Sequence, residues 1–190
     1  YTQILVDGIP LNDPTNSRGG SFDVGTIDLS TVQRIEVLRG PQSAKFGSDA
    51  MSGVVNFITK GGPSTTAVSL ESGLSAKGGH TERFSARGPI VNGKGFAVIG
   101  ATHLDEGRPV EGSSFSNTVV KAFADLNVSS TGRLEVALRS SKSDGTTFPD
   151  DSGGPKFAKS TSVDKREATE LAAGIKYNRE LLKTWNFELN

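Results

Sequence analysis

The chain contains no cysteine, and only one methionine and one tryptophan among its 190 residues. The absence of cysteine excludes a disulfide framework and any metal site built on thiolates. No apolar run approaches the roughly 20 residues that a membrane-spanning helix needs, so a membrane protein of this sequence would have to cross with strands. The formal net charge is zero, from 21 basic and 21 acidic side chains. This balance gives no reason to expect a nucleic-acid partner.

Apolar residues are also scarce, because they make up 34% of the chain. That fraction is low for a soluble protein with one large core. The chain has instead 23 glycines and 8 prolines, which are residues that favour turns. The composition therefore favours an all-β chain with many turns.

The part of the chain after Thr66 alternates between apolar and polar residues, which is the periodicity of β-strands. Clean alternation covers Val68–Leu74, Leu134–Leu138, Leu171–Tyr177 and Trp185–Leu189, and weaker alternation covers His80–Arg87, Phe96–Asp105 and Thr118–Val128. Seven strands therefore fit between Thr66 and Asn190. An apolar face opposite a charged face is typical of a lipid-facing wall around a wet lumen. A soluble β-sandwich also alternates, but a dry core would not tolerate charges on strand after strand.

The connectors between these strands differ in length. Gly88–Gly95, Ser129–Gly132 and Arg179–Lys183 are short, whereas Asp105–Phe115 and Gly145–Lys165 are longer and polar. Long and short connectors alternate along the later part of the chain, which predicts two different ends of one sheet. Ser75–Gly79 departs from this pattern, because it is short where a long connector is expected.

The first 62 residues have a different organisation. Ile4–Val6 is a short apolar run that ends at the turn signal Asp7-Gly8. Pro10–Gly25 is rich in Asn, Asp, Pro and Gly, and predicts a loop. Arg34–Arg39 alternates like a strand and ends at Gly40-Pro41, and Val54–Thr59 is a second, buried-looking strand.

Two motifs stand in this region, ILVDGIPLND at residues 4–13 and VQRIEVLRGPQSAKFGSDAMSGVVNFITKGG at residues 32–62. Their succession resembles the C-terminal half of the plug domain of TonB-dependent outer-membrane receptors. The resemblance implies an all-β fragment of a plugged antiparallel barrel, with residues 1–62 as the rear half of the plug. Residues 66–190 would be the first seven strands of a barrel that has about 22 strands in complete members.

The resemblance also implies a function and partners. The function would be energised uptake of a scarce nutrient, such as siderophore-bound iron or vitamin B12, across the bacterial outer membrane. The partners would be outer-membrane lipid, the nutrient ligand and the TonB complex of the inner membrane, whose contact segment would precede Tyr1. The chain would have no enzymatic activity and no cofactor. The alternative is a β-rich binding or adhesion module without transport.

Two sets of site residues follow from the resemblance. The loop after the first strand would point outward and touch the ligand through Leu11, Asn12, Asp13, Asn16 and Ser17. Glu36 and Arg39 would be buried charges that latch the plug to the barrel wall. The alternative readings are a solvated connecting loop and an exposed ion pair that contributes little to stability.

No other constellation predicts chemistry. The motifs GxSxG, GxGxxG and the P-loop are absent. His80 and His103 are far apart and match no zinc motif, so they are predicted to be ordinary strand or loop histidines. The carboxylates Asp144, Asp150, Asp151 and Asp164 lack the spacing of a calcium-binding EF-hand.

Overall fold

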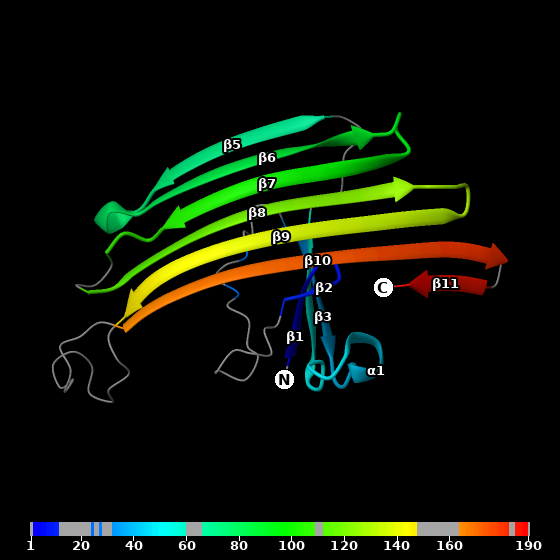
Figure 1. Ribbon diagram of the computed structural model, residues 1–190, viewed down its shortest axis with the longest axis horizontal. Helices are drawn as coiled ribbons and strands as arrows, with labels where there is room; N and C mark the ends of the chain where they lie inside the picture. Colours follow the sequence, from blue (N-terminus) through cyan, green and yellow to red (C-terminus); the bar gives the residue numbers. More distant parts are fainter. Residues whose placement is uncertain are drawn as a thin grey trace.

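The chain folds into two β-sheets, which Figure 1 shows as a curved wall of seven strands with a smaller sheet beside it. The computed structural model describes residues 2–11, 24, 27, 32–59, 66–108, 112–147, 164–182 and 185–189. The predicted all-β fold is confirmed. No helix in this described part of the chain is long and apolar enough to cross a membrane.

Four strands form the small sheet. In spatial order they are β2 (Ile9–Pro10), β1 (Thr2–Val6), β4 (Gly53–Thr59) and β3 (Val32–Arg39). β1 and β4 are parallel, and the other two pairs are antiparallel. β1 and β2 form a hairpin with the two-residue loop Asp7-Gly8, where both residues have positive φ, 51° and 83°. This is the type I′ geometry that the Asp-Gly signal favours.

The small sheet has a small core of its own. Leu5, Ala50 and Val54 are at most 1% exposed, and Phe46 packs against them. Phe46 belongs to α1 (Ser43–Phe46), a single helical turn between the break at Gly40-Pro41 and the turn at Gly47. The sequence predicted the break and the turn but not the helix, because four residues are too few to show a helical period.

Seven strands form the large sheet, and each pairs antiparallel with the next in the chain. They are β5 (Ala67–Leu74), β6 (His80–Ile90), β7 (Gly95–Asp105), β8 (Ser114–Asn127), β9 (Gly132–Thr147), β10 (Asp164–Leu182) and β11 (Trp185–Leu189), with the 3₁₀ turn η3 (Ala76–Gly78) between β5 and β6. The predicted number of strands is therefore confirmed.

The strands are longer than the sequence predicted. β6 continues to Ile90, so the turn before β7 is Val91–Lys94 and not Gly88–Gly95. β10 continues to Leu182, so Arg179–Leu182 is paired strand. β9 and β10 also pair from Thr147 and Asp164 onward, which shortens the expected Gly145–Lys165 connector. Backbone pairing continues here past the residues whose alternation marks the strand.

The two faces of the large sheet differ in chemistry. We call the face turned toward the small sheet the inner face and the opposite face the outer face. Exposed large apolar side chains on the outer face are Val68, Leu70, Leu74, Phe84, Ile99, Val120, Leu138, Leu171 and Ile175. Charged side chains on the inner face include Lys121, Asp125, Arg133, Glu135 and Arg139, which line the spaces between the sheets. The predicted segregation of apolar and charged faces is thus present in the fold.

Candidate functional site

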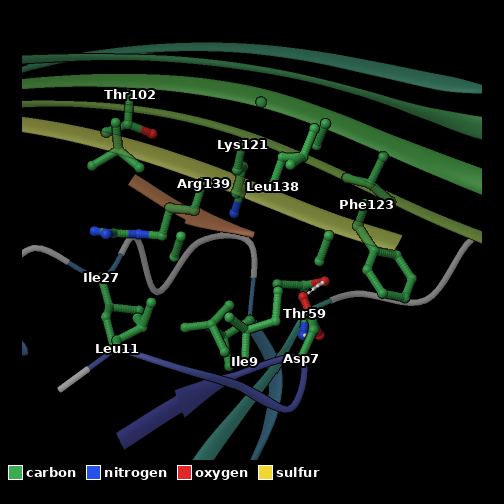
Figure 2. Close-up of a pocket in the computed structure, with 18 residues that line it drawn as sticks. Asp7, Ile9, Leu11, Ile27, Thr59, Thr102, Lys121, Phe123, Leu138 and Arg139 are labelled. Carbon is green, nitrogen blue, oxygen red and sulfur yellow. Dashed lines mark hydrogen bonds between the residues drawn. The ribbon is translucent and has the colours of Figure 1, made fainter. Parts of the chain in front are cut away.

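The candidate site is the contact between the small sheet and the inner face of the large sheet. A pocket at this contact is lined from the small sheet by Asp7, Ile9, Leu11 and Thr59, among others. Strands β7 to β10 provide the opposite wall, including Val98, Val119, Lys121, Phe123 and Arg139. Figure 2 shows Lys121 and Arg139 extending from the large sheet into this mostly apolar pocket.

The two sheets approach each other most closely at β2 and β10. A Cβ atom added at Gly174 would lie 2.5 Å from Cγ1 of Ile9. Ile9 therefore sits directly on the glycine backbone of β10, and only glycine leaves room for it. This contact places the β1–β2 hairpin against the wall.

Asp7 ties the tip of that hairpin to β4. Its Oδ1 accepts a hydrogen bond from the backbone N–H of Thr59, and its Oδ2 accepts one from Thr59 Oγ1, both at 2.8 Å. Figure 2 shows Asp7 and Thr59 on the small-sheet side of the pocket, across from the strands of the large sheet. The Asp7 N–H donates to the Phe57 carbonyl at 3.0 Å, and the Gly8 N–H donates to Asn56 Oδ1 at 3.2 Å. The hairpin tip is therefore fixed by side chains as well as by backbone pairing.

The electrostatic environment of Asp7 links the two sheets. Burial raises the pKa of the Asp7 carboxyl above its ordinary value of 3.8, although the Thr59 hydrogen bonds and the positive charge of Lys121 oppose this. Lys121 lies on β8 of the large sheet, so the attraction acts between the sheets. A buried carboxylate that is only partly compensated favours its neutral form.

Ion pairs bridge neighbouring strands on the inner face. Asp125 is 9% exposed and accepts two hydrogen bonds from Arg133, at 2.8 and 2.5 Å, while Glu135 lies 3.4 Å from the same guanidinium. Arg139 is 8% exposed and lies 3.4 Å from Glu170 on β10. Such polar groups are stable at a partly buried face because each has a charged partner.

The predicted ligand residues are only partly placed by the structure. Leu11 is buried, with 8% exposure, and lines the pocket, and its N–H donates to the Ile4 carbonyl at 2.9 Å. Asn12, Asp13, Asn16 and Ser17 lie outside the described residues. The ligand-contact role of these five residues stays a prediction.

The predicted latch residues lie on opposite sides of β3. Glu36 lies on the same side as Arg34 and forms an ion pair with it at 2.7 Å, with 45% of the Glu36 side chain exposed. Arg39 is also exposed and, three residues away on the same strand, points to the other side. The two residues therefore do not pair with each other, and any contact with a barrel wall would be made by each one separately. Their role as a latch stays a prediction.

Sequence reasoning missed the residues that join the sheets in the structure. Asp7 was identified only as a turn residue, and Thr59, Lys121 and Arg139 were not singled out. Asp7 and Thr59 are 52 positions apart, so no short motif contains both. The Asp-Gly signal accounts for the turn and gives no indication of its partner.

Known proteins share both parts of this arrangement. Residues 1–54 match the family described as the TonB-dependent Receptor Plug Domain. The fold of 98% of the chain matches the ferripyoverdine receptor of the outer membrane of Pseudomonas aeruginosa bound to ferripyoverdine, with a TM-score of 0.70 and 17% identity over 26% of that receptor. It also matches the siderophore receptor PirA from Acinetobacter baumannii, with a TM-score of 0.65 and 21% identity, again over 98% of the chain and over 31% of the receptor.

A third match is PirA from Pseudomonas aeruginosa, with a TM-score of 0.63 and 22% identity over 98% of this chain and 31% of that receptor. The chain thus spans less than a third of the length of these receptors. At these identities the structural matches establish the fold. All three matched structures are receptors.

Proposed function

We infer that the chain is part of a TonB-dependent receptor, and from this premise we propose that the protein imports a ferric siderophore across the bacterial outer membrane. The observation that carries the proposal is a plug-family segment, residues 1–54, packed on the charged face of a seven-stranded sheet whose other face is apolar. A lumen that holds a plug blocks diffusion, so import requires work from another source. The TonB complex of the inner membrane would supply that work.

The siderophore is preferred to vitamin B12 because the matched receptors include one bound to ferripyoverdine and two siderophore receptors. Residues 1–62 would be the rear part of the plug, and residues 66–190 the first barrel strands. Leu11, Asn12, Asp13, Asn16 and Ser17 would contact the ligand. The position of Leu11 in the pocket between the sheets supports this placement.

Uptake measurements test the proposal. The complete receptor, expressed in a strain without its own siderophore receptors, should accumulate radioactive iron from at least one siderophore of the hydroxamate, catecholate or mixed classes. Removal of TonB should abolish accumulation while surface binding persists, because binding needs no energy input. Accumulation that is independent of TonB, or uptake of vitamin B12 alone, would contradict the proposal.

The orientation of the large sheet gives a second prediction. One end carries η3 and the connectors around residues 106–113 and 148–163, and the other carries the turns at 91–94 and 128–131. We expect the first end to face outward, because extracellular loops of such barrels are the longer ones. In intact cells, a membrane-impermeant maleimide should therefore label Arg108→Cys but not Ser130→Cys. Both sites are exposed, and this part of the protein has no natural cysteine, so the receptor with neither substitution serves as the control for labelling elsewhere. The reverse labelling pattern would show the opposite orientation.

A further inference from the structure

The outer face of the large sheet carries a second cluster of polar residues that the transport proposal does not use. His80, Glu82 and His103 each offer one ligand atom, and these atoms all lie within 4.8 Å of one another. Glu82 lies directly opposite His103 in the β6–β7 register, and His80 is two residues away on the same side of β6. His80 Nε2 is 3.9 Å from Glu82 Oε1, and the two imidazole rings have their centroids 5.6 Å apart.

We propose that His80, Glu82 and His103 form a binding site for a zinc-type divalent cation. Two imidazole nitrogens and one carboxylate oxygen are a common ligand set for zinc, with the fourth position open to water. Ligand atoms around a tetrahedral zinc lie about 3.4 Å apart, given metal–ligand distances near 2.0–2.1 Å. Side-chain rotations that move the ligand atoms by roughly 1 Å would therefore bring the observed arrangement to this spacing.

A neighbouring hydrogen bond orients one of the ligands. His103 Nδ1 lies 2.8 Å from Thr118 Oγ1 on β8. This contact occupies one ring nitrogen and leaves Nε2 of His103 for the metal, which is the usual division of roles in a metal-binding histidine. Thr118 is thus a positioning residue for the site.

The backbone around the cluster is held in place. Ser75 N–H donates to the Gly79 carbonyl at 2.8 Å, directly before His80. Asp105 Oδ1 accepts from the Gly107 N–H at 2.7 Å, and the Arg108 N–H donates to the Lys77 carbonyl at 3.3 Å. These bonds join the β5–β6 turn to the end of β7, so the strand ends that carry the three ligands are fixed relative to each other. Such a fixed frame reduces the entropy that metal binding must overcome.

The position of the cluster allows an aqueous ion to reach it. On β6, β7 and β8 the outer face changes from apolar to polar between Phe84 and Glu82, between Ala101 and His103, and between Val120 and Thr118. On these three strands the cluster therefore lies just beyond the apolar residues, at the end of the sheet that carries η3, and Leu74 on β5 lies opposite His80. The side chains of His80 and Glu82 are 37% and 53% exposed. A bound cation would join β6 to β7 at this rim, and its carboxylate ligand would offset part of its charge.

Metal titrations of the complete receptor in detergent test the site. The wild-type receptor should bind one more zinc ion than either His80→Ala or His103→Ala, measured by competition with a chromophoric chelator. Cobalt(II) should give a d–d absorption band that both variants lose. We expect Glu82→Gln and Thr118→Ala to weaken zinc binding, the second by about 10-fold or less, because outer-shell partners contribute on that scale.

Thr81→Ala is the matched control, because Thr81 lies between His80 and Glu82 on β6 but points to the inner face. It should bind zinc as the wild type does. All the substituted side chains are on the strand surface, so intact folding can be verified by unchanged heat-resistant migration of the barrel. An equal zinc stoichiometry in the wild type and both histidine variants would overturn the proposal, whether or not siderophore uptake is observed.

Discussion

Replacing Gly53 with alanine is expected to destabilise the small sheet by roughly 3–5 kcal/mol, the scale of strain combined with a steric clash in a buried backbone. Gly53 begins β4 opposite Arg39, and its φ of 148° is one that residues with a side chain rarely adopt. A Cβ atom at this position would lie 2.4 Å from the backbone oxygen of Leu38. Because that atom belongs to the neighbouring strand, relief requires β3 and β4 to separate. Resistance of the small sheet to proteolysis in increasing urea, in the complete receptor, measures the loss.

Gly73→Ala is the control for this prediction. Gly73 is also a strand glycine, but a Cβ added there would meet nothing within 4 Å and its φ is not positive. The substitution should leave both sheets as stable as in the wild type. If Gly53→Ala and Gly73→Ala have equal effects, the close approach at Gly53 does not limit the stability of the small sheet.

The strands of the large sheet could be predicted because their two faces have different surroundings. An apolar outer face and a charged inner face impose a period of two that the sequence displays directly, as in Leu171–Tyr177. The strand ends could not be predicted in the same way. Ser140–Thr147 has no large apolar residue that could alternate, yet it pairs with β10 through the same backbone hydrogen bonds. Periodicity reports the chemistry of the faces, whereas pairing needs only the backbone.

The histidine cluster shows a different limit of sequence reasoning. His80 and His103 match no sequence motif. Residues that face each other across a β-hairpin are separated in the sequence by about twice the number of residues from either one to the turn, so their spacing varies with the length of the hairpin. Once the turn is placed at Val91–Lys94, counting outward sets Glu82 opposite His103. The sequence predicted a wider turn, Gly88–Gly95, so the register between the two flanking strands could not be counted. A correct turn would have revealed the cluster.

The contact between the sheets could not be derived from either segment. Asp7, Thr59 and Lys121 belong to three elements whose relative positions depend on packing, chiefly of Ile9 on Gly174. The alternation of β3, in contrast, already separated Glu36 from Arg39 by side. Local patterns thus determined which way side chains point, and tertiary packing determined which of them meet.

Replacing Asp7 with alanine is expected to destabilise the small sheet by about 3 kcal/mol. Two hydrogen-bond donors of Thr59, the N–H and the hydroxyl, would lose their acceptors. Leaving buried donors unsatisfied costs about 1–3 kcal/mol. Asp7 also has a positive φ of 51°, where alanine costs roughly 1–2 kcal/mol. Asp7→Gly separates these causes, because glycine accepts the backbone conformation and loses only the hydrogen bonds.

Asp7→Asn, unlike Asp7→Ala, should not destabilise the small sheet. The asparagine Oδ1 can accept from the Thr59 N–H, its Nδ2 can donate to Thr59 Oγ1, and Asn-Gly suits a type I′ turn. The amide is also neutral, so it avoids the burial of charge that raises the pKa of Asp7. At neutral pH we therefore expect Asp7→Asn to be at least as stable as the wild type. A loss as large as that of Asp7→Ala would show that the negative charge itself stabilises the sheet, through Lys121.

The pH dependence gives an independent test with a defined sign. Because the pKa of Asp7 in the folded protein lies above 3.8, the folded state binds this proton more tightly than the unfolded state does. As the pH rises from 3.8 through the folded-state pKa, the ionisation of Asp7 therefore lowers the free energy of unfolding. Above that range the contribution of Asp7 to the free energy of unfolding no longer changes with pH. Urea-dependent proteolysis at a series of pH values should show that the wild type gains stability relative to Asp7→Asn as the pH falls through this window. Parallel pH profiles of the two proteins would mean that Asp7 titrates as it does in the unfolded chain, and that its burial at the contact between the sheets has no energetic effect.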